Sequence, residues 1–439
     1  MTVPKDYVDD WDGDKGATPE GQSLTQLHAL LKSSTTSAAD GIRSRIRQML
    51  PIASLGVLPH RKTPKACTRV LHMNYMRGQA ASSAEMEHLL FFAHVVRELG
   101  LRLDILTDES CREEIEQALA ATGQLDYTIT TSQTPVSKWA EDSVEYLENG
   151  QVAVLRQFDD ELLQWAMTAG RRQRWQGKLS PENLEAALRD DHLWILLGTR
   201  VNVLKTGVGR ELAARDRSQQ VGHIRAYIEG GNMIAGEDAT GQPVLLVGKD
   251  AIAATARLYQ LKDAEVRQVI AEDFGLDSID RVICVEQPGK FHLDMGLLFV
   301  GDGRVIVNDS CLALKDAIEM VEWVPSLTTQ AMAAKLQLQC SLEEDTVADL
   351  QAAGLTVQRE KLENDVFYNF FNGEFVVGKD GCNYYITNGG PKEQEERLEA
   401  LLIGDLGVVE KIFFSPQAIA QKSLQEQGGV GCRLKGSRT

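Results

Sequence analysis

The most informative part of this sequence is Lys290-Phe291-His292-Leu293-Asp294-Met295-Gly296-Leu297-Leu298-Phe299-Val300. The apolar run that follows its glycine predicts a buried β-strand. If the strand also includes His292 and Asp294, their side chains share one face, because residues two apart in a strand point the same way. Burying a charge is costly unless it meets a partner, so the pair indicates a site that receives a cation. A pair exposed at a strand end is the alternative, and companions elsewhere in the chain must decide.

Composition narrows the class of protein. The chain has 439 residues, of which 43% are hydrophobic, enough for a large core in two or three domains or in one large repetitive domain. Its net charge of −17, without a large Lys/Arg cluster, predicts no nucleic-acid partner. No run of about 18 apolar residues predicts a membrane span. The N-terminus lacks the apolar segment of a secretory signal.

The cysteines indicate a compartment. There are seven, scattered without C-x-x-C spacing, which speaks against a zinc site and against a disulfide framework. We therefore expect a reducing cytoplasm, no metal and no cofactor. The oligomeric state cannot be inferred from the sequence.

The chain divides into three kinds of segment. Residues 1–65 are rich in Asp, Gly, Ser, Thr and Lys, which predicts a partly mobile extension outside the core. Residues 66–439 are expected to form one domain. Within it, the polar segment at about 158–193 carries Trp and Arg and is predicted to be a helical insertion.

Strands and helices alternate after residue 66. The sequence predicts strands at Val70–Met73, from Leu101 and at Tyr127–Thr130, and helices from a capping box at Ser82 to Gly100 and over Glu113–Ala121. A helix-Gly-strand junction recurs at Gly100, Gly275, Gly354 and Gly407. Asp263 and Ser341, the latter with Glu344 three residues later as in a capping box, are expected to cap the N-termini of two of these helices. The recurrence indicates a repeated unit, although any α/β protein has such turns.

Four more stretches carry chemical groups. They are Trp139-Ala140-Glu141-Asp142-Ser143 before a strand-like segment, Ile228-Glu229-Gly230-Gly231-Asn232 after a predicted strand His223–Ile228, a hairpin-like unit at Asn369–Val377, and Gln427-Gly428-Gly429-Val430-Gly431-Cys432. Each has an ordinary account on its own. Glu229 suits a turn, Asp142 a surface strand end, and Cys432 a small buried residue.

Together these residues fit one reaction. A nucleophilic Cys, a His with an orienting carboxylate, and two further carboxylates are what is needed to hold a planar guanidinium and attack its carbon. The glycines before Cys432 leave the thiolate accessible and expose backbone N–H groups that favour an anion.

The ordered set WxED, EGGN, HLDM and GGxGC resembles the pentein superfamily of guanidino-group-modifying enzymes: arginine deiminases, agmatine deiminases, dimethylarginine hydrolases and amidinotransferases. The resemblance covers about residues 66 to 439. It implies an α/β fold, a five-bladed propeller of repeated ββαβ units forming a catalytic domain. Asp142 and Asp294 would grip the guanidinium, Glu229 would orient His292, and Cys432 would be the nucleophile. Trp139, Glu141 and Asn232 are expected to contact substrate.

Two departures bear on the subfamily. Glu141 stands where arginine and agmatine deiminases usually have Arg, which is closer to the dimethylarginine hydrolases. Gly431 stands where deiminases and amidinotransferases commonly have His. Arg156, Arg200 and Arg225 are candidates to meet a substrate α-carboxylate.

The predicted function is hydrolysis of a C–N bond in a linear amidine, in the manner of arginine deiminase, through a thiouronium on Cys432. L-arginine is the first choice of substrate. Three alternatives remain: amidino transfer to an amine, a pentein binding module that does no chemistry, and an unrelated Cys-His hydrolase acting on amides. The last would need an oxyanion hole rather than Asp142 and Asp294.

Overall fold

The structure is a computed structural model. It describes residues 55–76, 83–132, 136–155, 181, 207, 209–215, 217–259, 261–288, 292–323, 327–364, 367–426 and 428–438. The predicted insertion at 158–193 lies outside these residues except for position 181, and Arg156 and Arg200 also lie outside them.

Five sheets share one pattern, in which an antiparallel pair of strands is followed by a parallel strand. Three of them contain β4 (Val144–Tyr146), β5 (Val152–Leu155) and β6 (Val221–Ile224); β7 (Met233–Glu237), β8 (Pro243–Gly248) and β9 (Val282–Val285); and β10 (Leu297–Gly301), β11 (Arg304–Asn308) and β12 (Thr356–Glu360). The fourth contains β15 (Gly373–Val377), β16 (Asn383–Thr387) and β17 (Lys411–Phe414).

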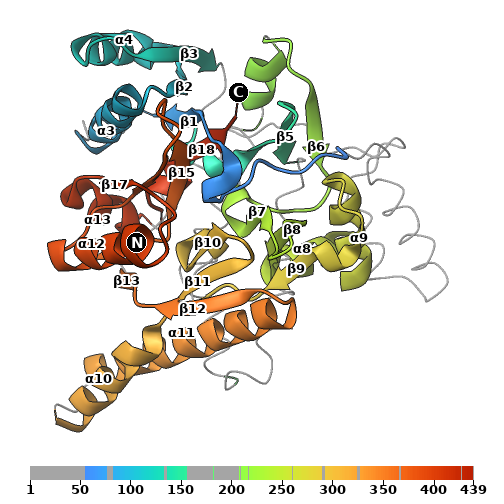
Figure 1. Cartoon of the computed structure of the whole chain (residues 1–439), viewed down its shortest axis with the longest axis vertical. Helices are drawn as coiled ribbons and strands as arrows, with labels where there is room; N and C mark the ends of the chain where they lie inside the picture. Colours follow the sequence, from blue (N-terminus) through green and yellow to red (C-terminus); the bar gives the residue numbers. More distant parts are fainter. Residues whose placement is uncertain are drawn as a thin grey trace.

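The fifth sheet joins the two ends of the described chain. It has the order β18 (Leu434–Ser437), β1 (Val70–Tyr75), β2 (Arg102–Asp108) and β3 (Asp126–Ser132). A two-stranded sheet, β13 (Glu363–Asn364) with β14 (Tyr368–Asn369), completes the described set. In Figure 1 the five larger sheets follow one another around the molecule in chain order.

Helices connect the second and third strands of the repeated unit. They are α3 (Ser83–Leu99) between β1 and β2, α8 (Lys249–Tyr259) and α9 (Asp263–Asp273), α10 (Ser310–Trp323) and α11 (Leu327–Ala352), and α12 (Lys392–Glu399) with the π-helix η8 (Ala400–Asp405). In the sheet of β1, a further helix, α4 (Arg112–Ala121), connects β2 to the additional strand β3. Near the C-terminus, α13 (Gln417–Gln425) and α14 (Val430–Arg433) precede β18. The result is a mixed α/β fold of several small sheets with a repeated ββαβ order.

The four glycine junctions are confirmed. Gly100, Gly275, Gly354 and Gly407 have φ between +59° and +82°, a left-handed conformation that glycine adopts without steric cost at a helix C-terminus. Each therefore ends a helical segment and lets the chain turn back toward a strand.

The core lies between the helices and sheets. Leu89, Phe92 and Val96, at helical spacing on α3, pack with Leu71 of β1 and Leu103 of β2. All five side chains are fully buried. Burial of this kind contributes about 1.5–3 kcal/mol for each large apolar side chain.

Several local predictions are wrong. Ser341 lies inside α11, which begins at Leu327, because the helical pattern extends further back than the capping box suggested. The N-cap of α9 is Lys262, and Asp263 is the first helical residue. Asn369–Val377 is not a hairpin, because β14 pairs with β13 whereas β15 pairs with β16.

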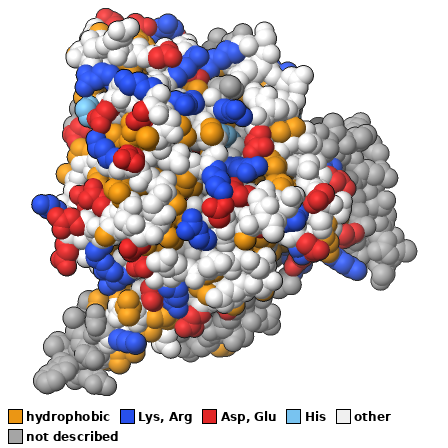
Figure 2. Space-filling model, viewed as in Figure 1, with side chains coloured by type: hydrophobic (Ala, Val, Ile, Leu, Met, Phe, Trp, Pro, Cys, Tyr) orange, Lys and Arg blue, Asp and Glu red, His pale blue; other side chains and the backbone are white. Residues whose placement is uncertain are grey.

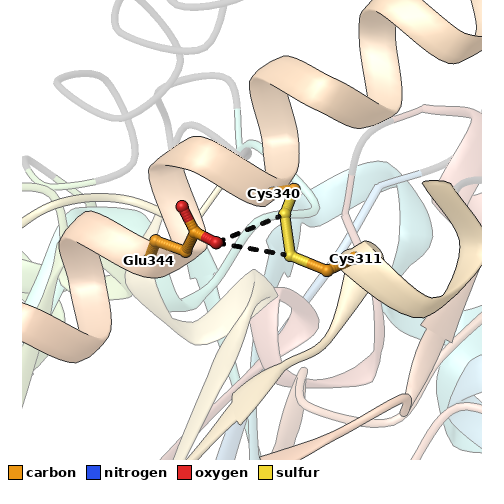
Figure 3. Close-up of side chains that lie close together, drawn as sticks. All are labelled: Cys311, Cys340 and Glu344. Carbon is orange, nitrogen blue, oxygen red and sulfur yellow. Dashed lines mark hydrogen bonds between the residues drawn. A yellow bond between two sulfur atoms is a disulfide. The ribbon is translucent and has the colours of Figure 1, made fainter. Parts of the chain in front are cut away.

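One disulfide is present where none was expected. Cys311 at the start of α10 is bonded to Cys340 of α11, and Glu344 lies beside both sulfur atoms (Figure 3). The spacing of 29 residues is too long to be seen as a local cysteine motif. The bond ties the two long helices together.

We expect the oxidised protein to lose about 2–4 kcal/mol of unfolding free energy in Cys340→Ser. A cross-link that closes a loop of 29 residues restricts the unfolded chain by roughly this amount. Urea unfolding with and without dithiothreitol measures it, and the reductant should abolish the difference from the parent. The matched control is Cys67→Ser, which removes an exposed free cysteine. Equal stability of Cys340→Ser and the oxidised parent would contradict the prediction.

The surface in Figure 2 carries acidic and basic side chains side by side, so the net negative charge is not gathered into one patch on this face. Among the described residues, no helix combines the length and apolar character needed to cross a membrane.

Candidate active site

The predicted site residues occupy equivalent positions in the repeated unit. Four of the five sheets contribute from a short helical turn before their first strand: η4 (Glu141–Ser143) before β4, η5 (Gly230–Asn232) before β7, η7 (Leu293–Met295) before β10, and α14 before β18. In the fifth, Asn372 immediately precedes β15. The repeat therefore presents one set of polar residues per sheet.

The His-Asp pair is not part of a strand, contrary to the sequence prediction. His292 is the N-cap of η7, Asp294 lies within η7, and β10 begins at Leu297. The turn still directs both side chains to one place, because a Cβ at Gly231 would lie 2.5 Å from His292 Nδ1 and 2.9 Å from Asp294 Oδ1. Only glycine permits this close approach.

The stretch around Glu229 also differs from the prediction. The strand β6 ends at Ile224, so Glu229 does not follow a strand directly but precedes the turn before β7. Gly230 packs against the turn of Glu141, since a Cβ there would lie 2.1 Å from the Glu141 carbonyl oxygen. Asn232 faces β8 instead, because its Oδ1 would lie 2.0 Å from a Cβ at Gly248.

His292 is held by two carboxyl groups. Its Nε2 lies 2.7 Å from Glu229 Oε2, and its Nδ1 lies 3.7 Å from Asp142 Oδ1. The Tyr227 hydroxyl donates to the other oxygen of Glu229. Burial alone would lower the pKa of His292, but the hydrogen bond that His292 donates to Glu229 and the charges of Asp142, Glu229 and Asp294 raise it overall. The imidazole is therefore prepared to carry a proton.

Cys432 is joined to Asp294 through Asn372. Asn372 Oδ1 accepts a hydrogen bond of 3.1 Å from the Cys432 N–H, while Asn372 Nδ2 lies 2.6 Å from Asp294 Oδ2 and 3.2 Å from Cys432 Sγ. Burial raises the pKa of the Cys432 thiol well above its usual value, and Asp294, Asp142 and Glu141 add to this. Without a bound cation the group is a thiol.

The glycine before Cys432 has a steric reason. A Cβ at Gly431 would lie 2.9 Å from the Gly373 nitrogen and 3.0 Å from Asn372 Nδ2. A larger side chain, such as the His that the sequence comparison had noted for this position, would displace Asn372 from Cys432. The glycine therefore fits the local packing.

Trp139 supports the turn that carries Cys432. A Cβ at Gly428 would lie 2.3 Å from the Trp139 ring, the Arg433 guanidinium stacks 5.1 Å from the ring centroid, and Trp139 packs with Met295, Leu424 and Cys432. Trp139 therefore packs directly against the turn of Cys432, and its contact with substrate stays a prediction.

Two lysines that the sequence analysis missed lie among the acids. Lys62 Nζ contacts Glu141 Oε1 and lies 3.2 Å from Asp294 Oδ2. Lys435 Nζ lies 2.7 Å from Glu145 Oε1 and 3.9 Å from Glu141 Oε1. Lys435 follows Cys432 by three residues on β18, so a lysine in a buried strand was a usable signal. Lys62 belongs to the predicted extension and had no such signal.

The carboxyl groups differ in protonation. Burial raises the pKa of Asp142 to about 7, and its Oδ1 is buried without a hydrogen-bond donor among the described residues. Burial also raises the pKa of Glu141 well above its usual value, with Asp294 adding to the effect. Asp294 behaves oppositely, because Lys62 and its other partners outweigh burial and lower its pKa. Of Asp294 and Asp142, Asp294 is thus the one that is ionised without a ligand. Asp142 can lose its proton when a cation binds beside it.

Arg225 does not reach a substrate. Its guanidinium is bound by Asp273 at 2.6 Å and by Glu272 at 3.3 Å, and the side chain is buried. A buried arginine paired in this way is structural. The expectation that it meets an α-carboxylate is not supported.

Glu141, Asp294 and Cys432 offer three possible metal-ligand atoms within 4.8 Å of one another. The two carboxylates already hold Lys62, which would compete with a metal ion. The same spacing occurs at Cys311, Cys340 and Glu344, where the two sulfur atoms are bonded to each other.

Comparisons with known proteins identify the fold. No family model and no curated protein matches the sequence. Among solved structures, the agmatine deiminase of Enterococcus faecalis superposes with a TM-score of 0.56 at 11% identity, over 89% of this chain and 99% of that one. This chain has the fold of the agmatine deiminases.

That likeness concerns the fold, and it agrees with the α/β fold of repeated ββαβ units that the sequence motifs implied. A second solved structure, a structural-genomics protein provisionally named agmatine deiminase, gives a TM-score of 0.53 at 11% identity and covers 87% of this chain and 95% of its own. At 11% identity the likeness concerns the fold alone. The substrate must therefore be inferred from the residues of the site.

The buried acid Glu374, near the site, is expected to make the stability of the protein depend on pH. Burial raises the pKa of Glu374 to about 7 from 4.5. A carboxyl whose pKa is higher in the folded chain stabilises the fold fully below pH 4.5 and loses this contribution as the pH rises through 7. We expect Glu374→Gln to gain about 2–3 kcal/mol of stability relative to the parent between pH 4.5 and pH 8. Urea unfolding at both pH values measures the difference, and an unchanged difference would contradict the prediction.

Proposed function

We propose that this chain hydrolyses a guanidino compound to a ureido product and ammonia, with Cys432 as the nucleophile. One observation carries the proposal. The turns before the first strands of four of the five sheets supply a buried thiol, a His292–Glu229 pair at 2.7 Å and the carboxyl groups of Asp142 and Asp294. We further propose that the five sheets are the blades of a propeller, which would direct these turns toward one axis.

The chemistry follows from the charges. A guanidinium bound by Asp142 and Asp294 adds a positive charge beside Cys432, so the thiol releases its proton to solvent more readily. The thiolate adds to the guanidinium carbon. Protonated His292 gives its proton to the departing nitrogen, the C–N bond breaks, and ammonia leaves from a thiouronium bonded to Cys432.

Water completes the reaction. Neutral His292 accepts a proton from water as the water oxygen adds to the thiouronium carbon. The C–S bond then breaks, which returns the sulfur of Cys432 and releases the ureido product. Glu229 stabilises the imidazolium in both half-reactions, since it accepts the hydrogen bond from His292 Nε2.

Agmatine is proposed as the substrate to test first, with L-arginine, the first choice from the sequence, tested beside it. Arg225 is already occupied by Asp273, which weakens the support for a substrate that bears a carboxylate. The similar solved structures named as agmatine deiminases support the amine. Both compounds present the same guanidinium to Asp142 and Asp294.

The experiment is an incubation of the purified chain with arginine, agmatine, methylated arginines and an arginyl peptide, with assays for ammonia and ureido product. Ammonia and ureido product in equal amounts support hydrolysis. An amidino product that appears only when an amine such as glycine is added would instead indicate amidino transfer. Binding without any product would indicate a pentein binding module.

A further inference from the structure

A segment of the predicted N-terminal extension is built into the fold. We call residues 55–66 the strap. Its backbone donates hydrogen bonds from Gly56 to the Asp273 carbonyl (2.7 Å), from His60 to the Tyr146 carbonyl (2.7 Å) and from Lys62 to the Ala235 carbonyl (3.0 Å). These bonds span two neighbouring sheets. The strap therefore fixes the position of the Lys62 backbone.

Lys62 carries its charge into the site. Its side chain is nearly buried, with an exposed fraction of 11%, and it contacts Glu141 and Asp294, whose exposed fractions are 0% and 3%. The Asp294 oxygen that faces Lys62 also accepts the 2.6 Å hydrogen bond from Asn372. Since Asn372 contacts Cys432 Sγ, Lys62 is linked to the nucleophile through Asp294 and Asn372.

We propose that Lys62 is a positioning residue that holds Asp294 and Glu141 in place and balances their charge, so that Cys432 can form a thiolate. The inference rests on the proposed role of Cys432 as nucleophile. The charged groups around this cluster are Glu141, Asp142, Glu145, Glu229, His292, Asp294, Glu374 and Lys435. Acids outnumber bases among them, so removal of Lys62 leaves a more negative environment for the sulfur.

The contacts of Lys62 explain why its effect is specific. Lys435 is engaged mainly by Glu145, at 2.7 Å, and is further from Glu141, at 3.9 Å. Lys62 instead holds the two acids whose ligand atoms lie within 4.8 Å of Cys432 Sγ. Loss of its ammonium would free Asp294 to rotate away from Asn372 and would raise the proton affinity of the thiol.

The test measures Cys432 directly and needs no substrate. Alkylation by iodoacetamide is followed from pH 6 to pH 10 by mass spectrometry of the peptide that contains Cys432. We expect Lys62→Met to slow alkylation at pH 8 by about tenfold, equivalent to one pKa unit, and to move the pH profile upward. Lys62→Arg keeps the charge and should restore the parent rate to within about threefold.

Two further variants test whether the effect on Cys432 comes from the position and charge of Lys62 rather than from a loss of folding. Lys65→Met removes the other lysine of the strap, which pairs with Asp302 at an exposed position, and should leave the profile unchanged. Lys62→Met combined with Asp294→Asn removes one charge of each sign beside Cys432 and should recover most of the parent rate. This double variant also keeps the test decisive if Lys62→Met alone does not fold. An unchanged profile in Lys62→Met, or a double variant as slow as the single one, would overturn the proposal.

The outcome is distinguishable from that of the proposed function. If alkylation shifts as expected while no guanidino compound is consumed, the role of Lys62 stands and the proposed hydrolase fails. If arginine or agmatine is consumed while Lys62→Met alkylates like the parent, the hydrolase stands and this inference fails.

Discussion

Cys432→Ser is expected to lose at least about a thousandfold in kcat on the guanidino substrate while the protein remains folded. A serine hydroxyl at this position is a far weaker nucleophile than a thiolate, and the covalent intermediate cannot form. Cys432 is buried against Met295 and Leu424. Serine is close to it in size and can still accept a hydrogen bond from Asn372, so we expect a stability loss of about 1 kcal/mol.

Steady-state kinetics and urea unfolding of the same preparation measure both effects. The matched control is Cys111→Ser, which changes another buried free cysteine, one that packs in the core around β1 and β2. It should lose a similar amount of stability and keep kcat within about threefold. A Cys432→Ser enzyme with more than a tenth of the parent activity would show that the nucleophile lies elsewhere.

The repeated unit was readable from the sequence because its turns require glycine. The four junction glycines have positive φ, a backbone conformation that few other residues adopt, so a glycine is required there and can be recognised in the sequence: Gly100, Gly275, Gly354 and Gly407. The start of α11 requires no particular residue type and could not be recognised in this way. Ser341 resembles a cap but lies inside a longer helix, because tertiary packing overrides a local capping preference.

The sequence predicted which residues the candidate site contains, but it predicted the wrong local backbone structure for them. His292 and Asp294 were placed by strand periodicity, whereas a 3-10 turn holds them. Short turns before strands have no periodic pattern, so only the motif indicated them. Lys62 could not be predicted at all. Its contact with Asp294 crosses 232 positions, and a single lysine in a polar segment gives no sign that it is buried.

Asp142→Asn and Asp294→Asn are each expected to lower kcat/KM for a guanidino substrate by about 30-fold to several thousandfold. Loss of a charge-assisted contact to a buried cation costs about 2–5 kcal/mol. The two carboxyl groups differ in the other contacts that they make in the site. Asp142 Oδ1 has no donor among the described residues and is free to accept one from the substrate. Asp294 also orders Asn372 and so affects Cys432.

The two variants should therefore differ in a second measurement, the rate of Cys432 alkylation in the absence of substrate. Asp294→Asn removes a negative charge near the sulfur and loosens Asn372, so alkylation should change, whereas Asp142→Asn should affect mainly substrate turnover. Asp104→Asn is the control, since Asp104 is a buried acid paired with Arg217 at 2.8 Å in another sheet, and its folded enzyme should keep kcat/KM within about threefold. A loss of tenfold or less in both site variants would favour an amide hydrolase with the same Cys and His, because such an enzyme needs an oxyanion hole and has no use for two acids facing a cation.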